Sequence, residues 1–121
     1  MANPIHQKKI ETHAKENNKM ANWNKWRDKH HTIAVDLSEA DLSLLNLSGA
    51  DLSNANLYKT DFAQSNCADC DFSGANCQDA DFRETNLRGA IFLETDLRGA
   101  ETKGAKNADF SSALLTPREA A

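Results

Sequence analysis

A five-residue repeat runs through this sequence from about residue 35 to residue 104. Its central position holds Leu, Phe or Cys thirteen times in succession. The residue before each centre is Asp or Asn twelve times, with Ile91 as the exception, and the residue two before is usually small. The centres are Leu37, Leu42, Leu47, Leu52, Leu57, Phe62, Cys67, Phe72, Cys77, Phe82, Leu87, Phe92 and Leu97. The fold must therefore bury a row of side chains that recurs every five residues.

A period of five fits neither a long α-helix nor a continuous strand. A helix turns by about 100° per residue, so successive centres would lie about 140° apart and form no stripe. A strand alternates its faces with period two, so an odd step would move each centre to the opposite face. The row stays buried if the chain turns once per repeat. Three extended residues would then be followed by two turn-forming residues, which predicts an all-β solenoid.

The repeat resembles that of the pentapeptide-repeat proteins. The resemblance is carried by segments such as Ala40-Asp41-Leu42, Ala50-Asp51-Leu52, Ala55-Asn56-Leu57 and Ala80-Asp81-Phe82. It implies a right-handed quadrilateral β-helix with four repeats in each coil. Residues 32–116 would form about 3.5–4 coils, in which residues twenty apart lie one above the other.

The four-sided arrangement sorts the central residues by size. Phe62 and Phe82 share a face with Leu42, and Phe72 and Phe92 share the opposite face with Leu52. The other two faces carry only Leu and Cys at their centres. Alternation of large and small side chains fills a narrow interior at constant volume, which favours four sides.

Residues 1–31 are expected to form an N-terminal helical cap. Good helix formers fill about residues 5–29, and Met20, Trp23 and Trp26 recur at intervals of three, which predicts an apolar stripe over the first coil. The run Trp23-Asn24-x-Trp26-Arg27 is similar to a leader found on many bacterial pentapeptide-repeat proteins. The alternative is that this stripe forms a groove for a peptide or a partner protein.

The repeat weakens toward the C-terminus. Thr102 and Asn107 occupy expected centres, and five-residue spacing then resumes in a shifted frame. A loop at residues 104–107 is expected to absorb the shift, and Pro117 is expected to end the regular chain before a tail of residues 117–121. The residues of the shifted frame would close this end or leave an apolar surface for self-association; they are Phe110, Leu114 and Leu115.

Charge is divided between the two parts of the chain. Residues 1–31 hold seven Lys/Arg and three Asp/Glu, a formal charge of +4, whereas residues 32–116 hold six and fourteen, a formal charge of −8. The four-sided arrangement stacks Asp41, Asp61, Asp81 and Glu101 into an outward acidic ladder. This ladder is interpreted either as a solvated face whose side chains bond local turn amides or as a surface for a basic partner. An acidic solenoid repels phosphate, so no direct binding of nucleic acid is expected.

The residues that could carry chemistry are explained by the repeat. Cys67, Cys70 and Cys77 occupy inward positions, where a free Cys acts as a small hydrophobe, and a zinc site usually needs four ligands. The sequence contains no recognised catalytic or phosphate-binding motif, so neither enzymatic activity nor a cofactor is expected. An odd number of Cys, no secretory signal and no membrane-spanning segment are typical of a cytoplasmic protein.

The sequence therefore predicts a non-enzymatic scaffold that binds an unidentified protein through a ladder face or an exposed end. The family resemblance supplies an alternative. Some longer members resemble DNA in shape and charge, and they bind DNA gyrase or topoisomerase IV. This chain shares the repeat and an acidic face with them.

Overall fold

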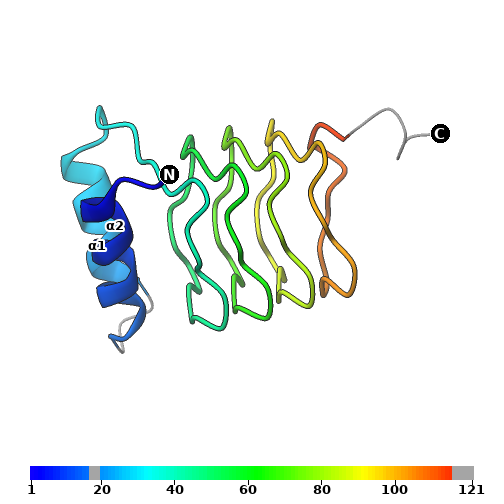
Figure 1. Cartoon of the computed structure of the whole chain (residues 1–121), viewed down its shortest axis with the longest axis horizontal. Coiled ribbons are helices and arrows are strands. Elements are labelled where there is room, and N and C mark those ends of the chain that lie inside the picture. The colour runs from blue at the N-terminus through cyan, green and yellow to red at the C-terminus, as the bar shows by residue number, and fades with distance from the viewer. Residues whose placement is uncertain (17–19, 116–121) are drawn as a thin grey trace.

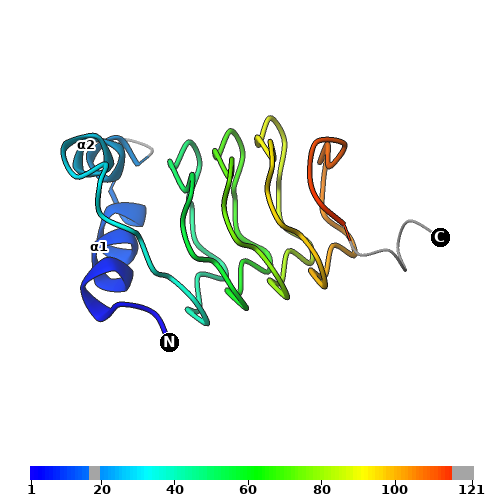
Figure 2. The ribbon, with the colours of Figure 1, turned by 90° about the horizontal axis from the view of Figure 1, so that it is seen from above.

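The computed structural model describes residues 1–16 and 20–115 of the chain. Two helices, α1 (Pro4–Ala14) and α2 (Ala21–Lys29), lie together at one end of an elongated molecule (Figure 1). The remaining described chain winds into a row of coils that extends away from the helices along the long axis, as both perpendicular views show (Figure 2). The N-terminal helical segment, residues 1–31, is called the cap segment below.

Each coil pairs with the next through residues that lie twenty apart. Parallel bridges connect the outward Asp and Asn positions in four columns, which begin at Asp36, Asp41, Asn46 and Asp51. In each bridge the later residue uses both of its backbone groups, and the two neighbours of the earlier residue supply the partners. For example, the Leu42 N–H donates to the Asp61 carbonyl at 2.8 Å, and the Asp61 N–H donates to the Ala40 carbonyl at 2.9 Å. Four columns and a twenty-residue period give the coil four sides.

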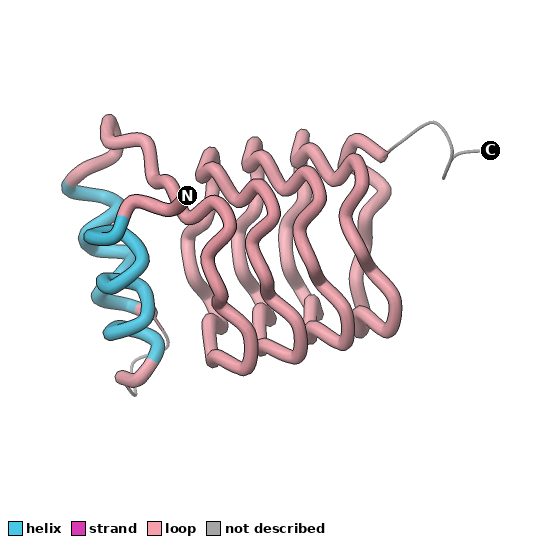
Figure 3. Tube along the Cα trace, viewed as in Figure 1, coloured by secondary structure: helices cyan, strands magenta, loops and turns pink. Residues whose placement is uncertain are grey.

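The sides of the coil are too short to form regular strands. All bridges in the solenoid are isolated, and the described coils are drawn as loop in Figure 3. The reason is the turn in every repeat, whose second residue has a left-handed backbone, with φ of 62° at Glu39, 56° at Lys59 and 78° at Gly49. In each repeat the bridged residue is flanked by two residues that supply the hydrogen-bonding groups, as Ala40 and Leu42 do around Asp41, and a two-residue turn follows.

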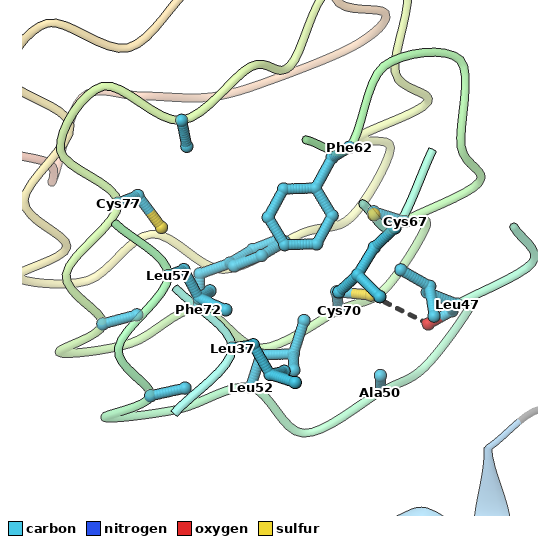
Figure 4. Close-up of a cluster of buried hydrophobic side chains, with 14 of the residues drawn as sticks. Leu37, Leu47, Ala50, Leu52, Leu57, Phe62, Cys67, Cys70, Phe72 and Cys77 are labelled. Carbon is cyan, nitrogen blue, oxygen red and sulfur yellow. Dashed lines mark hydrogen bonds between the residues drawn. The ribbon is translucent and has the colours of Figure 1, made fainter. Parts of the chain in front are cut away.

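The thirteen central residues are all buried. The Phe rings form two columns, in which Phe62 stacks on Phe82 and Phe72 stacks on Phe92, each with centroids 5.0 Å apart. The two columns meet edge to face, with 5.7 Å between the centroids of Phe62 and Phe72. Figure 4 shows Phe62 and Phe72 among the Leu and Cys side chains of the interior. The core thus contains stacked and T-shaped aromatic contacts, both of which are favourable.

Thr and Cys side chains at the other inward position donate to backbone carbonyls of the preceding coil. Thr60 donates its hydroxyl to the Leu37 carbonyl at 2.8 Å, and Thr95 donates to the Phe72 carbonyl at 2.6 Å. The Cys70 thiol reaches the Leu47 carbonyl at 2.9 Å in the same way (Figure 4). Each donor lies 23 residues after its acceptor, so Thr and Cys can replace Ala in the interior without leaving a buried donor unpaired.

The shift of frame at the C-terminal end lies later than expected. Lys106 still pairs with Asn86 twenty residues away, whereas Leu114 pairs with Asp96 eighteen residues away. The two-residue shortening therefore falls between 106 and 114, because the bridge at Lys106 holds the first part of the expected loop in register. Phe110 packs on Phe92, with centroids 5.0 Å apart. Leu114 and Leu115 are 50% and 40% exposed, and the predicted stop at Pro117 and the tail lie outside the described residues.

Substitution of Gly74 tests how closely the turns of neighbouring coils pack on one another. Gly74 has φ of 69°, and a Cβ on it would collide with the Oδ1 atom of Asn54 in the coil above. We expect Gly74→Ala to lower the free energy of unfolding by roughly 1–2 kcal/mol from the left-handed backbone alone, with a further loss from the collision. Urea denaturation measures the change. The double variant Asn54→Gly/Gly74→Ala should regain the steric part, and wild-type stability of Gly74→Ala would contradict this account of the corner.

Candidate functional site

The cap segment covers part of the open edge of the first coil. A terminal coil presents backbone N–H and C=O groups that have no neighbouring coil to pair with. Trp23 and Arg27 of α2 both donate to the Asp51 carbonyl, through Nε1 and Nη1 at 2.9 Å each. A second guanidinium nitrogen, Nη2, donates to the Ser53 carbonyl at 2.7 Å. These contacts explain why the side chains of Trp23 and Arg27 are both buried against the first coil.

The side chain of Asn24 both accepts and donates a hydrogen bond at the same edge of the first coil. Its Oδ1 accepts from the Asp51 N–H at 2.8 Å, and its Nδ2 donates to the Gly49 carbonyl at 2.9 Å. The N-terminal end of the cap segment also contacts the first coil, on the side that contains Asp36. There the Asn3 N–H donates to the Asp36 carbonyl at 2.9 Å. Sequence analysis did not foresee a role for Asn24. Its position beside Trp23 in the leader run was the available signal.

The predicted apolar stripe requires a correction. The cap segment consists of two helices, and Met20 lies outside both, with φ of 70° at the residue that precedes α2. Met20 and Trp23 are nevertheless buried, whereas Trp26 is only partly buried. The buried Ile10 of α1 supplies an apolar contact that the spacing did not predict. The three predicted residues therefore do not form one helical stripe, because α2 begins only at Ala21.

His6 of α1 makes the stability of the cap segment dependent on pH. Its Nδ1 accepts from the Asp36 N–H at 3.1 Å, so the ring must be neutral there and carry its proton on Nε2. Burial lowers the pKa of His6 from its ordinary value, and the Arg27 and Lys9 charges lower this pKa further, against the opposite effect of Asp36.

Below the ordinary pKa of His6, about 6.5, the unfolded chain binds a proton that the folded chain excludes. The stabilisation from His6 is therefore complete above that pH and is lost as the pH falls. We expect the melting temperature of the wild type to drop between pH 8 and pH 5.5 by more than that of His6→Gln, which keeps a hydrogen-bond acceptor but does not titrate. Equal decreases in the melting temperatures of the two proteins, measured by calorimetry, would show that His6 does not contribute to the pH dependence of stability.

The predicted acidic ladder exists as a column. Asp41, Asp61, Asp81 and Glu101 are connected by consecutive bridges. The Oδ1 of Asp41 accepts from the Ser43 N–H at 3.0 Å, and that of Asp61 accepts from the Ala63 N–H at 2.8 Å. Hydrogen bonds from the Ser43 hydroxyl and backbone hold the pKa of Asp41 below its ordinary value. The ladder carboxylates thus form the local turns and still direct charge outward.

Arginines neutralise part of the acidic surface. Arg83 pairs with Asp81 through Nη2 and Oδ2 at 2.7 Å, and Arg98 pairs with Asp96 at 2.8 Å. The hydrogen bonds from Arg83 lower the pKa of Asp81. The neighbouring column carries neutral side chains at Asn46, Asn66 and Asn86 and ends at Lys106, and the side chain of Asn66 donates to Asn46 at 3.4 Å. Within the described residues, the ladder carboxylates that form no ion pair are consequently those of Asp41, Asp61 and Glu101.

The three cysteines are buried and unpaired by disulfides. Burial raises the pKa of Cys70 and of Cys77 well above the ordinary value for a thiol. The described residues contain no group of side chains suited to hold a metal ion. Because the thiolate is the reactive form, we expect native protein to react with a thiol reagent at least about 100-fold more slowly than protein in 6 M urea. Fast labelling of all three in native protein would place them outside the core.

Neither helix of the described residues is long and apolar enough to cross a membrane. Hollows in the described part of the chain include three on the cap segment and one beside Gln64, Glu84 and Lys106. The outward columns and the surface of the cap segment both present side chains that another molecule can contact.

Comparison with known proteins places these features in context. A family model described as Pentapeptide repeats matches residues 33–66 and 65–101, with eight copies. The chain is similar to the solved structure of a pentapeptide repeat protein from Nostoc PCC 7120, with 27% identity over 69% of this chain and 83% of that chain and a TM-score of 0.59. No curated protein sequence matches the chain.

Two other solved structures show weaker similarity. HetL, a pentapeptide repeat protein from Nostoc described as involved in the regulation of heterocyst differentiation, is 30% identical over 66% of this chain and 44% of that chain, with a TM-score of 0.31. A pentapeptide repeat protein from Cyanothece is 28% identical over 69% of this chain and 61% of that chain, also with a TM-score of 0.31.

Proposed function

Because the chain belongs to the family of pentapeptide repeat proteins, whose fold is a right-handed quadrilateral β-helix, we propose that it is a non-enzymatic scaffold that binds another protein. In this proposal residues 1–31 cap a solenoid of about 3.5–4 coils, and the protein acts in the bacterial cytoplasm. The binding surface is the ladder face that includes Asp41 and Asp61.

The observation that supports this function is the register of the outward residues. Bridged residues follow one another at one residue per coil in every column, so each side presents a regular row of side chains. Rows of this kind on an extended solenoid suit the recognition of a protein surface. Asp41 is exposed and has no basic partner among the described residues, so this end of the ladder presents charge to a basic partner.

The ladder can be tested without disturbing its turns. Asn replaces Asp naturally in the neighbouring column and bonds the turn in the same way, as the Asn66 Oδ1 does with the Ala68 N–H at 3.1 Å. Asp41→Asn/Asp61→Asn therefore removes two charges and keeps the hydrogen bonds. Asp51→Asn/Asp71→Asn makes the same change of charge in a different column and serves as the matched control.

Affinity capture from the organism that encodes the protein compares the three forms. We expect at least one protein to be recovered with the wild type and the control variant and to be lost with Asp41→Asn/Asp61→Asn, because its basic surface no longer meets the ladder. Identification of that protein by mass spectrometry and reconstitution from purified components complete the test. Equal recovery with all three forms would reject the ladder as the binding surface.

A second candidate is binding to DNA gyrase or topoisomerase IV through a DNA-like surface. The formal charge of −8 on residues 32–116 favours it. The Arg83–Asp81 and Arg98–Asp96 pairs and the column of Asn residues that ends at Lys106 weaken it, because DNA carries unbroken negative charge. A supercoiling assay with DNA gyrase tests this candidate. Inhibition of gyrase by the wild type but not by Asp41→Asn/Asp61→Asn would support it. Gyrase activity that is unchanged at a large molar excess of the wild type would reject it.

A further inference from the structure

We infer that the cap segment carries a second binding site, beside Trp26, for an acidic peptide segment of a partner protein. This inference rests on the proposed protein-binding function, but it concerns a different surface and a different ligand chemistry from the ladder. It rests on a hollow that is lined by a partly buried indole ring and by three lysines that form no ion pair within the described residues.

The hollow lies between the two helices of the cap segment and has a volume of about 570 Å³. Helix α1 contributes Lys9 and His13, and α2 contributes Lys25, Trp26 and Lys29. His30, which follows α2, completes the basic part of the lining. One carboxylate, that of Asp28, also lines it. Three ammonium groups against one carboxylate give the hollow a net positive charge at neutral pH.

The lysines of this hollow form no ion pair with the described part of the chain. Within residues 1–16 and 20–115, none of Lys9, Lys25 and Lys29 has a carboxylate oxygen within ion-pair distance. The two histidines, by contrast, are already engaged. His13 bonds the Glu16 carboxylate, and His30 donates from Nδ1 to the Trp26 carbonyl at 2.9 Å. The lysines are therefore the groups left to attract an anion from outside, and a concave site strengthens that attraction.

The surroundings of Trp26 favour carboxylates over nucleobases. Its ring already contacts His6, Trp23 and His30, with centroids 5.6, 5.4 and 5.2 Å away, and the Lys9 Nζ lies 5.2 Å from its centroid. A base that stacked on this ring would have to displace one of these neighbours, whereas recognition of single-stranded nucleic acid needs an open aromatic face. A flexible acidic segment instead can place carboxylates on the lysines and an aliphatic side chain against the ring edge.

The concave shape favours a projecting segment over a second copy of this chain. The acidic columns of the solenoid are straight rows on the sides of the coil, and their carboxylates are bonded to local turns. A peptide has no such restriction and can enter the hollow. Self-association through the same lysines is therefore treated as a contrary outcome in the experiment.

Fluorescence anisotropy with the intact protein tests the site. The probe is a fluorescein-labelled ten-residue peptide that contains six Glu and two Leu, and its control carries Gln in place of every Glu. A labelled ten-nucleotide oligo-dT serves as the nucleic-acid arm. Lys25→Gln/Lys29→Gln alters the hollow, and Lys8→Gln/Lys15→Gln removes two charges from another face of the cap segment, beside a separate shallow hollow. Thermal unfolding verifies that both variants are folded.

We expect the Glu peptide to bind the wild type at least about tenfold more tightly than the Gln peptide, and more weakly at high salt. Lys25→Gln/Lys29→Gln should raise its Kd about tenfold, and Lys8→Gln/Lys15→Gln less than about threefold. Equal binding of the two peptides, equal effects of the two variants or tighter binding of oligo-dT would each overturn the inference. Concentration-dependent self-association that only Lys25→Gln/Lys29→Gln abolishes would overturn it in favour of a second copy.

The ladder experiment separates failure here from failure of the proposed function. If the peptide does not bind but Asp41→Asn/Asp61→Asn loses a captured partner, the scaffold function stands and the site beside Trp26 is rejected. If the hollow variant loses both the peptide and a captured protein, the inference and the scaffold function are both supported.

Discussion

Phe72→Ala should lower the free energy of unfolding by about 3–5 kcal/mol. Phe72 is fully buried at the junction of the two aromatic columns, stacked on Phe92 and edge-on to Phe62 and Phe82, with centroids 5.0, 5.7 and 5.5 Å away. Removal of the ring leaves a cavity that the coil cannot close, because bridges on all four sides hold the neighbouring coils at a fixed spacing. Equilibrium urea denaturation measures the loss.

Phe72→Leu is the matched control for this prediction. Leu52 occupies the same column one coil earlier and is fully buried, so Leu is compatible with the position. The expected loss is less than about 1.5 kcal/mol if the neighbours repack around the smaller side chain. A loss for Phe72→Ala no larger than that for Phe72→Leu would mean that the aromatic columns do not determine the stability of the core.

The interior could be predicted because the repeat specifies it locally. Once the chain turns every five residues, the direction of each side chain follows from its place in the repeat, and the Phe residues sort onto two opposite faces. The left-handed corners were less evident, because residues as different as Leu44, Lys59 and Glu94 occupy them. The stacking of coils imposes that conformation on them whatever their intrinsic preference. The hand of the solenoid came from the family resemblance and not from the period.

The surfaces were predicted less completely, because they depend on contacts between segments that the repeat does not relate. The acidic column was expected, but its neutralisation by Arg83 depends on the rotamer of one side chain. The sequence left open a groove at Trp26, but its basic lining could not be foreseen, because Lys9 and Lys25 come together only when α1 and α2 pack side by side. The bond between His6 and Asp36 spans thirty residues and likewise depends on where the helices dock.

The second large loss of stability is expected on substitution of Trp23, through which the helices dock on the first coil. Its side chain is fully buried, and its Nε1 donates to the Asp51 carbonyl on the first coil. We expect Trp23→Ala to lower the free energy of unfolding by about 3–5 kcal/mol, because it removes the largest buried side chain of the cap segment and exposes the first coil. Trp23→Phe keeps an aromatic ring but loses the hydrogen bond and some volume, so a smaller loss of about 1–2 kcal/mol is expected.

A double-mutant cycle with Arg27→Met shows whether Trp23 acts through the edge of the coil. Arg27 donates to the same Asp51 carbonyl, so this oxygen keeps one donor when either side chain is replaced and loses both in Trp23→Phe/Arg27→Met. The double variant should therefore lose more stability than the sum of the single losses, by roughly 1 kcal/mol, since a buried carbonyl without a partner costs more than one lost bond of two. Strictly additive losses in urea denaturation would mean that water replaces both donors, and that the helices stabilise the solenoid by apolar contact alone.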